Sequence, residues 1–447
     1  MSNLYRDQTH SATVIADRSA ISESPRNTAV EAEVDVLVVG GGPAGIAAAL
    51  AAAKNGAKTL ILERHGMLGG VWTAGLLNPL FDHARKGYIV AELIQRLQSA
   101  NAWISWKWSN CFDVEIMKRE LERWCDELKV EYWYHCPVVD AIVENGRVRG
   151  AIVEGKWGRR AVLTKVVIDA SGEGDFAARA GAEYHLGRAS DGLCQPTTLM
   201  FEIDGLPHDW VEDTSQGLYD AMTETIARCK LPWKLPFERA NYVPWIINLP
   251  QAGTASVQLT HAYRVDSLDT RAVSRATADC RRMVHEAMDI LHRLPGFEHI
   301  RLRATAAALG IRESRRILGG YILDISDVQT GRHFDDGITF GAFGVDIHEP
   351  APGSGIPSGH DVKMRPYEIP YRCLLPRGLD GLLTAGRCIS GTHEAHASYR
   401  VTGTCMGMGQ AAGVAAAWAA ADGVMPAAIS GPALRKRLVG LGCGVLG

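Results

Sequence analysis

The sequence has no excess of charge of one sign and no apolar run of membrane-spanning length. Its 47 lysines and arginines stand against 50 aspartates and glutamates, a net charge of −3 at pH 7. The apolar stretch 411–421 is shorter than the ~18 residues that a membrane span needs, and it is rich in alanine. We therefore expect neither nucleic acid nor a membrane as a partner.

Cysteine patterns of zinc sites and disulfide frameworks are also missing. The ten cysteines are scattered, with no CxxC pair and no zinc-like spacing. Residues 1–33 are polar, mixed in charge and without the apolar core of a signal peptide. We expect reduced, buried thiols in a cytoplasmic protein, with residues 1–33 as a flexible arm. The 47% hydrophobic content is ample for a large core, and the length predicts two or three domains.

The clearest pattern that is present lies in residues 33–66. A short run of branched apolar residues is typical of a buried parallel strand, and an alanine-rich segment after it is typical of a helix. In order, the unit has a strand at 34–39, a glycine turn, a helix at 46–54 and a second strand at 58–62.

The glycines of this unit have GxGxxG spacing. Gly40 permits a tight turn, Gly42 lets the backbone approach a pyrophosphate, and Gly45 lets the helix pack close to the strand. The helix amides and dipole then face the phosphate charge. Glu63, at the end of the second strand, can accept ribose hydroxyls. Strand, glycines, helix, strand and acid together predict a dinucleotide site.

Two further elements resemble those of the fumarate reductase-like flavoproteins, in which FAD lies extended along the fold. RHGMLGGVWTAG (64–75) is similar to their second glycine element, and ASGEGD (170–175) to the turn that returns the chain to FAD. Between them, 130–163 is predicted to be an antiparallel meander with an Asn-Gly turn at 145–146. The resemblance implies FAD rather than NAD and places residues 136–138 at the adenine.

The C-terminal segment 370–417 resembles the last FAD element of the family called FAD-dependent oxidoreductases. Its GLLTAGR strand is followed by an irregular crossing at 391–402 and by a helix expected to begin at Gly403. GIRESRRILGGYIL (310–323) is also typical of that family. The resemblance implies that the last helix points its N-terminus at the flavin ring, where a positive helix end stabilises the anionic reduced flavin.

The resemblance implies an α/β fold: a Rossmann-like, glutathione reductase-like FAD-binding domain with an inserted α+β substrate domain. The FAD domain is expected at 34–190 and 370–425, the insertion at 191–369 and a C-terminal tail at 426–447. Val71-Trp72-Thr73 follow the glycine pair, with no histidine or cysteine for covalent linkage, so non-covalent FAD is expected. The residues expected at FAD are Gly40, Gly42, Pro43, Ala44, Gly45, Glu63, Arg64, Gly69, Gly70, Val71, Trp72, Val138, Ala170, Ser171, Gly172, Asp175, Gly386, Arg387, Gly403, Thr404 and Cys405.

Four ionisable residues precede the last helix: His393, Glu394, His396 and Arg400. Related flavoproteins use histidine and arginine near this element to hold a carboxylate or polarise a carbonyl. Arginine suits a carboxylate because its fork binds both oxygens, and histidine transfers protons near neutral pH. We take His393 and Arg400 as the first catalytic candidates and Glu394 and His396 as secondary ones. The alternative is a structural role, in which these side chains form hydrogen bonds that fix the conformation of residues 391–402. HEAH is not HExxH and shows no third ligand, so no metal is expected.

Three further features each have two interpretations. Arg312 is a candidate for contact with substrate or flavin, whereas Arg315 and Arg316 fit an interdomain ion-pair network. Cys405, in the first turn of the last helix, is either a thiol of lowered pKa or a small residue under the flavin. The segment WISWKW contains Trp103, Trp106 and Trp108. Their two interpretations are stacking on an aromatic substrate and packing over a core or a subunit contact.

These features predict an FAD-dependent oxidoreductase. Hydride would pass between a small anionic organic substrate, bearing a carboxylate, and flavin N5. A flavoenzyme without net redox (elimination, hydration or desulfurisation of a carboxylated heterocycle) and a non-catalytic flavin sensor are the alternatives. There is no second GxGxxG unit for NAD(P)H, so the electron partner stays open between oxygen, a quinone, another protein and the substrate. Family habit and the N-terminal arm favour a homodimer.

Overall fold

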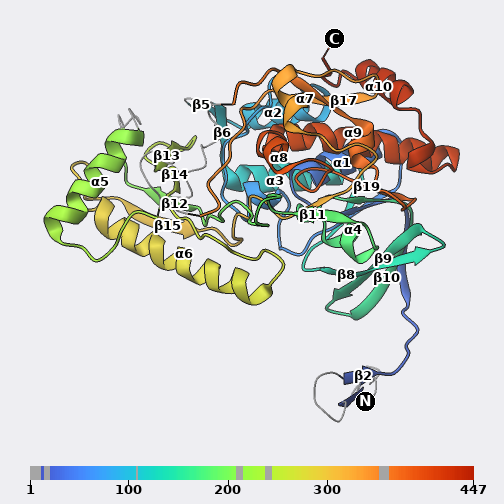
Figure 1. Ribbon diagram of the computed structural model, residues 1–447, viewed down its shortest axis with the longest axis horizontal. Coiled ribbons are helices and arrows are strands. Elements are labelled where there is room, and N and C mark those ends of the chain that lie inside the picture. Colours follow the sequence, from blue (N-terminus) through green and yellow to red (C-terminus); the bar gives the residue numbers. More distant parts are fainter. Residues whose placement is uncertain are drawn as a thin grey trace.

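The computed structural model describes residues 12–14, 21–106, 109–207, 215–236, 244–351 and 362–446 (Figure 1). Trp108, one of the tryptophans considered above, lies outside the described residues. Two large sheets organise the chain. One has a parallel core with an antiparallel extension, and the other is antiparallel. Figure 1 shows the helices α5 (Ser215–Cys229) and α6 (Thr270–Leu291) beside the second sheet.

The parallel sheet is built around the predicted glycine unit. β3 (Val30–Val39) pairs in parallel with β4 (Thr59–Leu62) on one side and β10 (Gly158–Asp169) on the other. β7 (Glu131–Trp133) extends the sheet beyond β4, and β19 (Leu382–Thr384) pairs with the end of β10. β4 is wholly buried and the last residues of β3 nearly so, as expected for strands covered on both faces. All five strands run the same way, so their carboxyl ends share one edge.

An antiparallel meander continues this sheet, as the sequence predicts. β8 (Val138–Glu144), β9 (Arg147–Gly155) and the first half of β10 pair in turn. The turn between β8 and β9 has positive φ at Asn145 (51°) and Gly146 (76°), the geometry that Asn-Gly favours. β3 starts earlier than the predicted 34–39 because residues 30–33 pair with the first half of β10, although most of them are exposed.

Two helices pack closely behind the parallel sheet. α1 (Pro43–Lys54) packs closely against α9 (Thr402–Asp422). A Cβ on Gly409 would lie 2.1 Å from the Ala44 carbonyl oxygen, and a Cβ on Gly413 equally close to that of Ala48. The glycines of the last helix therefore fix its distance from the first.

The inserted part contains a four-stranded antiparallel sheet of order β13-β14-β12-β15. Its strands are β13 (Trp245–Asn248), β14 (Ala255–Gln258), β12 (Phe201–Asp204) and β15 (Arg301–Thr305). The apolar side of α6 belongs to the same buried cluster as this sheet, and Asp269 caps the helix by accepting from the amides of Arg271 and Ala272.

The remaining elements connect these units. β11 pairs with β16 and so connects the segment after α4 with the GIRESRR segment. β17 pairs with β18 near α9. Their bounds are α2 (Tyr88–Ser99), β5 (Trp103–Trp106), β6 (Ser109–Phe112), α3 (Val114–Glu127), α4 (Asp175–Arg179), β11 (Tyr184–Leu186), β16 (Arg315–Ile317), α7 (Ile325–Thr330), β17 (Gly337–Gly341), β18 (Tyr367–Pro370), α8 (His393–Tyr399) and α10 (Gly431–Gly440).

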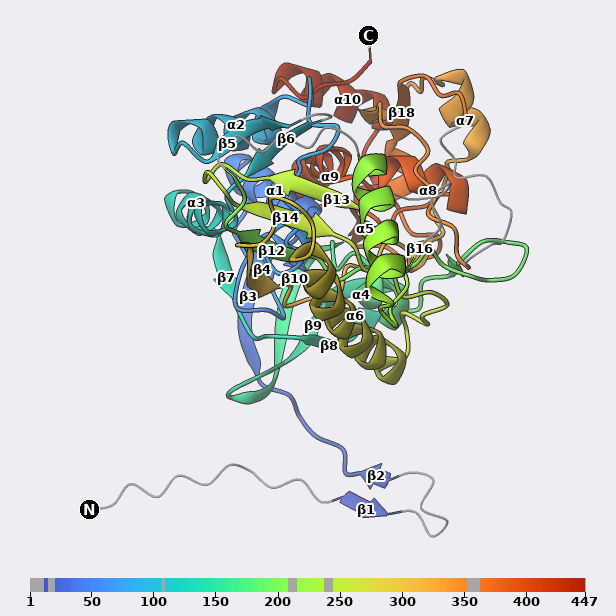
Figure 2. The same ribbon diagram turned by 90° about the vertical axis from the view of Figure 1, so that its left-hand side faces the viewer.

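Two local predictions need comment. The crossing expected to be irregular at 391–402 contains the helix α8, because the Thr392 hydroxyl caps it by accepting from the Ala395 amide. At the other end of the chain, β1 (Ala12–Val14) and β2 (Ile21–Glu23) form a hairpin that stands away from the rest of the described chain (Figure 2). Within the described ranges, the helices lack the length and apolarity of a bilayer span.

Candidate active site

A cavity of about 400 Å³ lies where the carboxyl edge of the parallel sheet faces the inserted sheet. Its lining includes the glycine turn after β3, the ASG turn after β10, the start of α9 and residues of β13 and β14. Volumes of roughly 300–1,000 Å³ are usual for cofactor and substrate sites. The cavity thus joins the predicted dinucleotide elements to the insertion.

The glycine turn leaves the start of α1 open to the cavity. Gly40 has φ of 97°, which favours glycine, and a Cβ there would lie 2.7 Å from the Ala170 carbonyl oxygen. A Cβ on Gly42 would meet nothing nearer than 4.0 Å, so the cavity side of this residue is empty space. No side chain caps α1, and Pro43 stands at its first turn. This uncapped helix end suits a pyrophosphate.

Glu63 is held at the edge of the cavity by backbone amides. Its Oε2 accepts from the Gly41 N–H and its Oε1 from the His65 N–H, both at 2.8 Å. The side chain is buried, and each oxygen keeps a lone pair for a hydroxyl group. The residue fits the predicted ribose contact.

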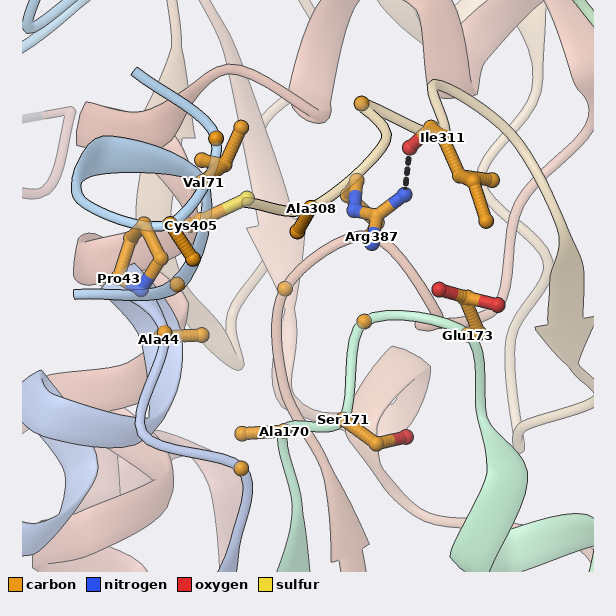
Figure 3. Close-up of a pocket in the computed structure, with 18 of the residues that line it drawn as sticks. Pro43, Ala44, Val71, Ala170, Ser171, Glu173, Ala308, Ile311, Arg387 and Cys405 are labelled. Atoms are coloured by element: carbon orange, nitrogen blue, oxygen red, sulfur yellow. Dashed lines mark hydrogen bonds between the residues drawn. The ribbon is translucent and has the colours of Figure 1, made fainter. Parts of the chain in front are cut away.

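The ASG turn is fixed from below by a buried carboxylate. Asp169 accepts from the amides of Ser171 (2.9 Å) and Ala177 (2.7 Å), while burial raises its pKa. Above the turn, Glu173 and Arg387 point into the same space, and Arg387 donates to the Ile311 carbonyl oxygen (Figure 3). Burial raises the pKa of Glu173, against the opposing effect of Arg387. The turn, Arg387 and the 308–311 loop therefore form one wall.

Most of the predicted FAD residues meet in this cavity. Those in its lining are Gly40, Gly42, Pro43, Ala44, Glu63, Arg64, Gly70, Val71, Val138, Ala170, Ser171, Gly172, Asp175, Gly386, Arg387 and Cys405. The rest lie behind it: Gly45, Gly69, Trp72, Gly403 and Thr404. Gly45 packs against Gly40, and the Gly403 amide donates to the Phe81 carbonyl oxygen at 2.9 Å, so that amide is not an open donor.

The surroundings of Cys405 favour the second of its two interpretations, a small residue at the flavin site. Cys405 lines the cavity, as do Pro43 and Ala308, which are labelled with it in Figure 3. Burial raises the pKa of Cys405 to about 12, and its Sγ donates to the Arg400 carbonyl oxygen at 3.3 Å. The helix dipole is the weaker effect here because the thiol is removed from water. Cys405 is therefore a neutral packing residue at neutral pH.

The insertion side of the cavity forms a pocket that we call the chamber. It is lined by Thr198, Trp245, Gln258, Arg312, Phe343, Asp346, His348 and Arg400. Arg312 donates through one terminal nitrogen to the Pro196 carbonyl and the Thr198 hydroxyl, both at 2.7 Å. In the described part of the chain the other nitrogens of Arg312 have no hydrogen bond. Its guanidinium can therefore take a further acceptor.

Asp346 connects two other chamber residues. Its carboxylate accepts from Arg400 at 2.9 Å and lies 3.2 Å from His348 Nε2. Burial acts to raise the pKa of Asp346, but His348, Arg400 and Arg312 hold it far below its usual range. The chamber thus carries two guanidinium groups against one described carboxylate.

His393 is buried and is not part of the cavity lining. Its Nδ1 contacts Glu313 Oε1 at 2.9 Å, and the same buried carboxylate oxygen pairs with Arg316. Arg316 also donates to the carbonyl oxygens of Gly187 (2.6 Å) and Gly391 (3.0 Å). These contacts join the GIRESRR segment to α8. They agree with the alternative in which the ionisable residues before the last helix form structural hydrogen bonds.

The other candidates on α8 are outside the lining too. His396 is buried, packs edge-on against Tyr399 and has no hydrogen bond within the described ranges. Burial, with Arg316 and Arg400 nearby, lowers the pKa of His396 well below its usual value. Glu394 is half-buried. Arg315 pairs with Asp175 at 2.8 Å, in line with an ion-pair role.

Sequence reasoning missed Asp346 and His348. They follow β17 in a stretch without regular secondary structure, and no motif surrounds them. Trp245 and Gln258 face each other across β13 and β14, a pairing set by strand register. A histidine two residues after an aspartate was the signal available, and it is common by chance.

Comparison with known proteins assigns the chain that forms this cavity to a family. The FAD dependent oxidoreductase family matches residues 35–438. The chain is 34% identical over 121 residues to thiamine thiazole synthase of Aeropyrum pernix, which is 27% of this chain and 43% of that protein. It is 31% identical over 194 residues to digeranylgeranylglycerophospholipid reductase 1 of Methanopyrus kandleri, which is 40% of this chain and 49% of that protein.

These matches span less than half the length of the two relatives. Among solved structures, the flavin-dependent brominase Bmp2 is similar at 15% identity with a TM-score of 0.47, over 91% of this chain and 83% of that one. The family match covers nearly the whole chain, including every element that lines the cavity. The chain belongs to the FAD-dependent oxidoreductase family, and its cofactor is FAD.

Proposed function

We propose that the protein transfers hydride between a small, carboxylate-bearing organic substrate and the N5 atom of non-covalently bound FAD. The observation that carries this proposal is the chamber, where Arg312 and Arg400 line the cavity opposite the dinucleotide elements. Bound FAD supplies the two-electron chemistry, and the side chains position the substrate.

The charge of the chamber supports an anionic substrate. Arg400 is already bonded to Asp346, whereas Arg312 contacts two neutral oxygens. A carboxylate next to Arg312 would gain a charge-assisted hydrogen bond to a half-buried guanidinium group. Arg312 is thus our anion-binding residue, and Arg400 with Asp346 is its support.

The walls of the chamber favour a substrate with an apolar body. Trp245 and Phe343 line it together with the amide of Gln258. Aromatic side chains exclude water and pack on flat apolar groups, while one amide can orient a polar substituent. A homodimer in the cytoplasm and the absence of a nucleic-acid partner remain part of this proposal.

The first test is an absorption spectrum of the purified protein, followed by anaerobic mixing with a panel of small carboxylic acids. Bleaching of the flavin band by one acid, with formation of its oxidised product, is the expected result. Conversion of an acid without bleaching or an electron acceptor would support the non-redox alternative instead. If no acid reacts with either the oxidised or the reduced enzyme, the proposed substrate class is wrong.

Arg312→Gln tests the role of the guanidinium. We expect FAD to be retained and the apparent affinity for the reacting acid to fall by at least tenfold. Arg303→Gln is the matched control, because Arg303 is exposed on β15 and contacts Gln251 rather than the cavity. Equal kinetics in the two variants would remove Arg312 from the site.

A further inference from the structure

We propose that a carboxylate binding in the chamber brings a proton with it, and that this proton is held on His348 and shared with His261. The inference rests on the proposed function, since it takes an anion beside Arg312 as its starting point. It assigns proton storage to the two histidines of the insertion and not to His393.

His348 is oriented from one side. Its Nε2 lies 3.2 Å from the Asp346 carboxylate, so the neutral ring carries its hydrogen on Nε2 and directs it at Asp346. Its backbone N–H donates to the Gln195 side-chain oxygen at 3.1 Å. The lone pair of the neutral ring is then on Nδ1. This leaves Nδ1 as the atom that receives a proton.

A second imidazole faces that atom. His261 Nε2 lies 3.4 Å from His348 Nδ1, and the two rings are inclined by 32° with centroids 5.6 Å apart. His261 is buried beside the chamber and outside its lining. A proton added to Nδ1 of His348 can therefore be donated to His261 Nε2. The pair shares one added charge, with the Asp346 carboxylate behind it.

The charged groups around His348 keep it neutral before an anion binds. Burial, together with Arg312 and Arg400, lowers the pKa of His348 to about 4 against the opposing effect of Asp346. Burial and Arg312 also lower the pKa of His261. A carboxylate beside Arg312 cancels much of that positive field, so the histidine pair can be protonated at a higher pH.

The step is a simple proton balance. One anion and one proton leave the solvent, a hydrogen bond forms at Arg312, and an N–H bond forms at Nδ1 of His348. No bond to carbon is broken and no electron moves.

Proton uptake can be measured directly with benzoate and oxalate as probes. Calorimetric titration of the FAD-loaded protein at pH 6 in buffers of different ionisation enthalpy gives the number of protons taken up. We expect more than half a proton per bound anion, and an affinity that falls as the pH rises from 5 to 8. In His348→Gln the uptake should fall to near zero while the anion still binds.

His299→Gln is the control, because His299 is exposed and distant from the cavity lining. It should keep the full uptake, and His261→Gln should reduce it. Binding without uptake in the wild type, or unchanged uptake in His348→Gln, would overturn the assignment. Failure of both anions to bind would overturn the anion site, whereas a protein that binds them but oxidises no acid would contradict only the proposed function.

Discussion

The two ends of the cavity are built in different ways. The FAD end consists of short local units, in which a strand, a turn and a helix follow one another directly. The chamber collects Thr198, Trp245, Gln258, Arg312, His348 and Arg400 from separate segments of the chain. One end presents mainly backbone and glycine, and the other presents charged and aromatic side chains.

This difference explains what each end can tolerate. A backbone cradle depends on close approach, so a single added methyl group damages it. A side-chain chamber depends on charge and hydrogen bonds, so a single substitution changes its ligand while the fold persists. The substitutions below test that contrast in order of decreasing effect.

The largest effect is expected for Gly45→Ala. The new Cβ would lie 1.8 Å from the Gly40 carbonyl oxygen and 3.2 Å from Ala170 Cβ, so the glycine turn must move. We expect purified protein without flavin, or no folded protein. Gly440→Ala is the control, since a Cβ there meets nothing within 4 Å. Full flavin content in Gly45→Ala would break the contrast.

The junction between the two ends should be the next most sensitive point. Glu313 is buried, pairs with Arg316 and His393, and accepts from the Gln195 amide at 3.1 Å. Glu313→Gln leaves Arg316 with an uncompensated buried charge, which costs about 3–5 kcal/mol in typical cases. Urea unfolding of the FAD-loaded protein would measure the loss.

Glu286→Gln provides the comparison for this junction. Its carboxylate is partly exposed on α6 and lies 3.7 Å from Arg282. A change within ~0.5 kcal/mol is expected. Similar losses in the two variants would show that Glu313 does not hold the junction together.

Much of the fold could be predicted because it is encoded locally. The GxGxxG unit and the Asn-Gly hairpin each depend on neighbouring residues. The chamber could not be predicted in the same way. Its Asp346–His348 pair has no motif, and the contact between His393 and Glu313 joins residues 80 positions apart.

Cys405 shows why an argument from neighbouring residues alone can predict a pKa shift in the wrong direction. Its place in the first turn of α9 predicts a lowered thiol pKa, and this prediction is wrong because burial has the larger effect. The burial of Cys405 depends on how α1, the loop that contains Phe81 and the insertion pack around the start of α9. None of those contacts is visible in the residues around position 405.

A smaller effect should appear as a pH dependence of stability. The folded-state pKa of His348 is about 4, below the usual 6.5, so the unfolded chain binds this proton more readily. The stabilising contribution is complete above pH 6.5 and is lost as the pH falls toward 4. Between pH 7 and pH 4.5 we expect a loss of ~2 kcal/mol from this residue.

Denaturation of wild type and His348→Gln at the two pH values would test this contribution. The loss of stability on acidification should be smaller in the variant, although His261 and His396 keep part of it in both proteins. An identical acid dependence would mean that His348 is not held neutral in the folded protein. It would also weaken the proposed proton storage.

The smallest effect is expected at the rim of the FAD end, where a side chain replaces the backbone cradle. Arg64 lines the cavity but is 55% exposed, and its nearest acid, Glu173, is 3.8 Å away. Exposed pairs of this kind contribute about 0–1 kcal/mol, so Arg64→Ala should leave stability almost unchanged. FAD affinity, measured by fluorescence on reconstitution, should fall by less than ~10-fold. If Arg64→Ala lost flavin as completely as Gly45→Ala, the FAD end would depend on side-chain charge as much as the chamber does, and the contrast between the two ends would fail.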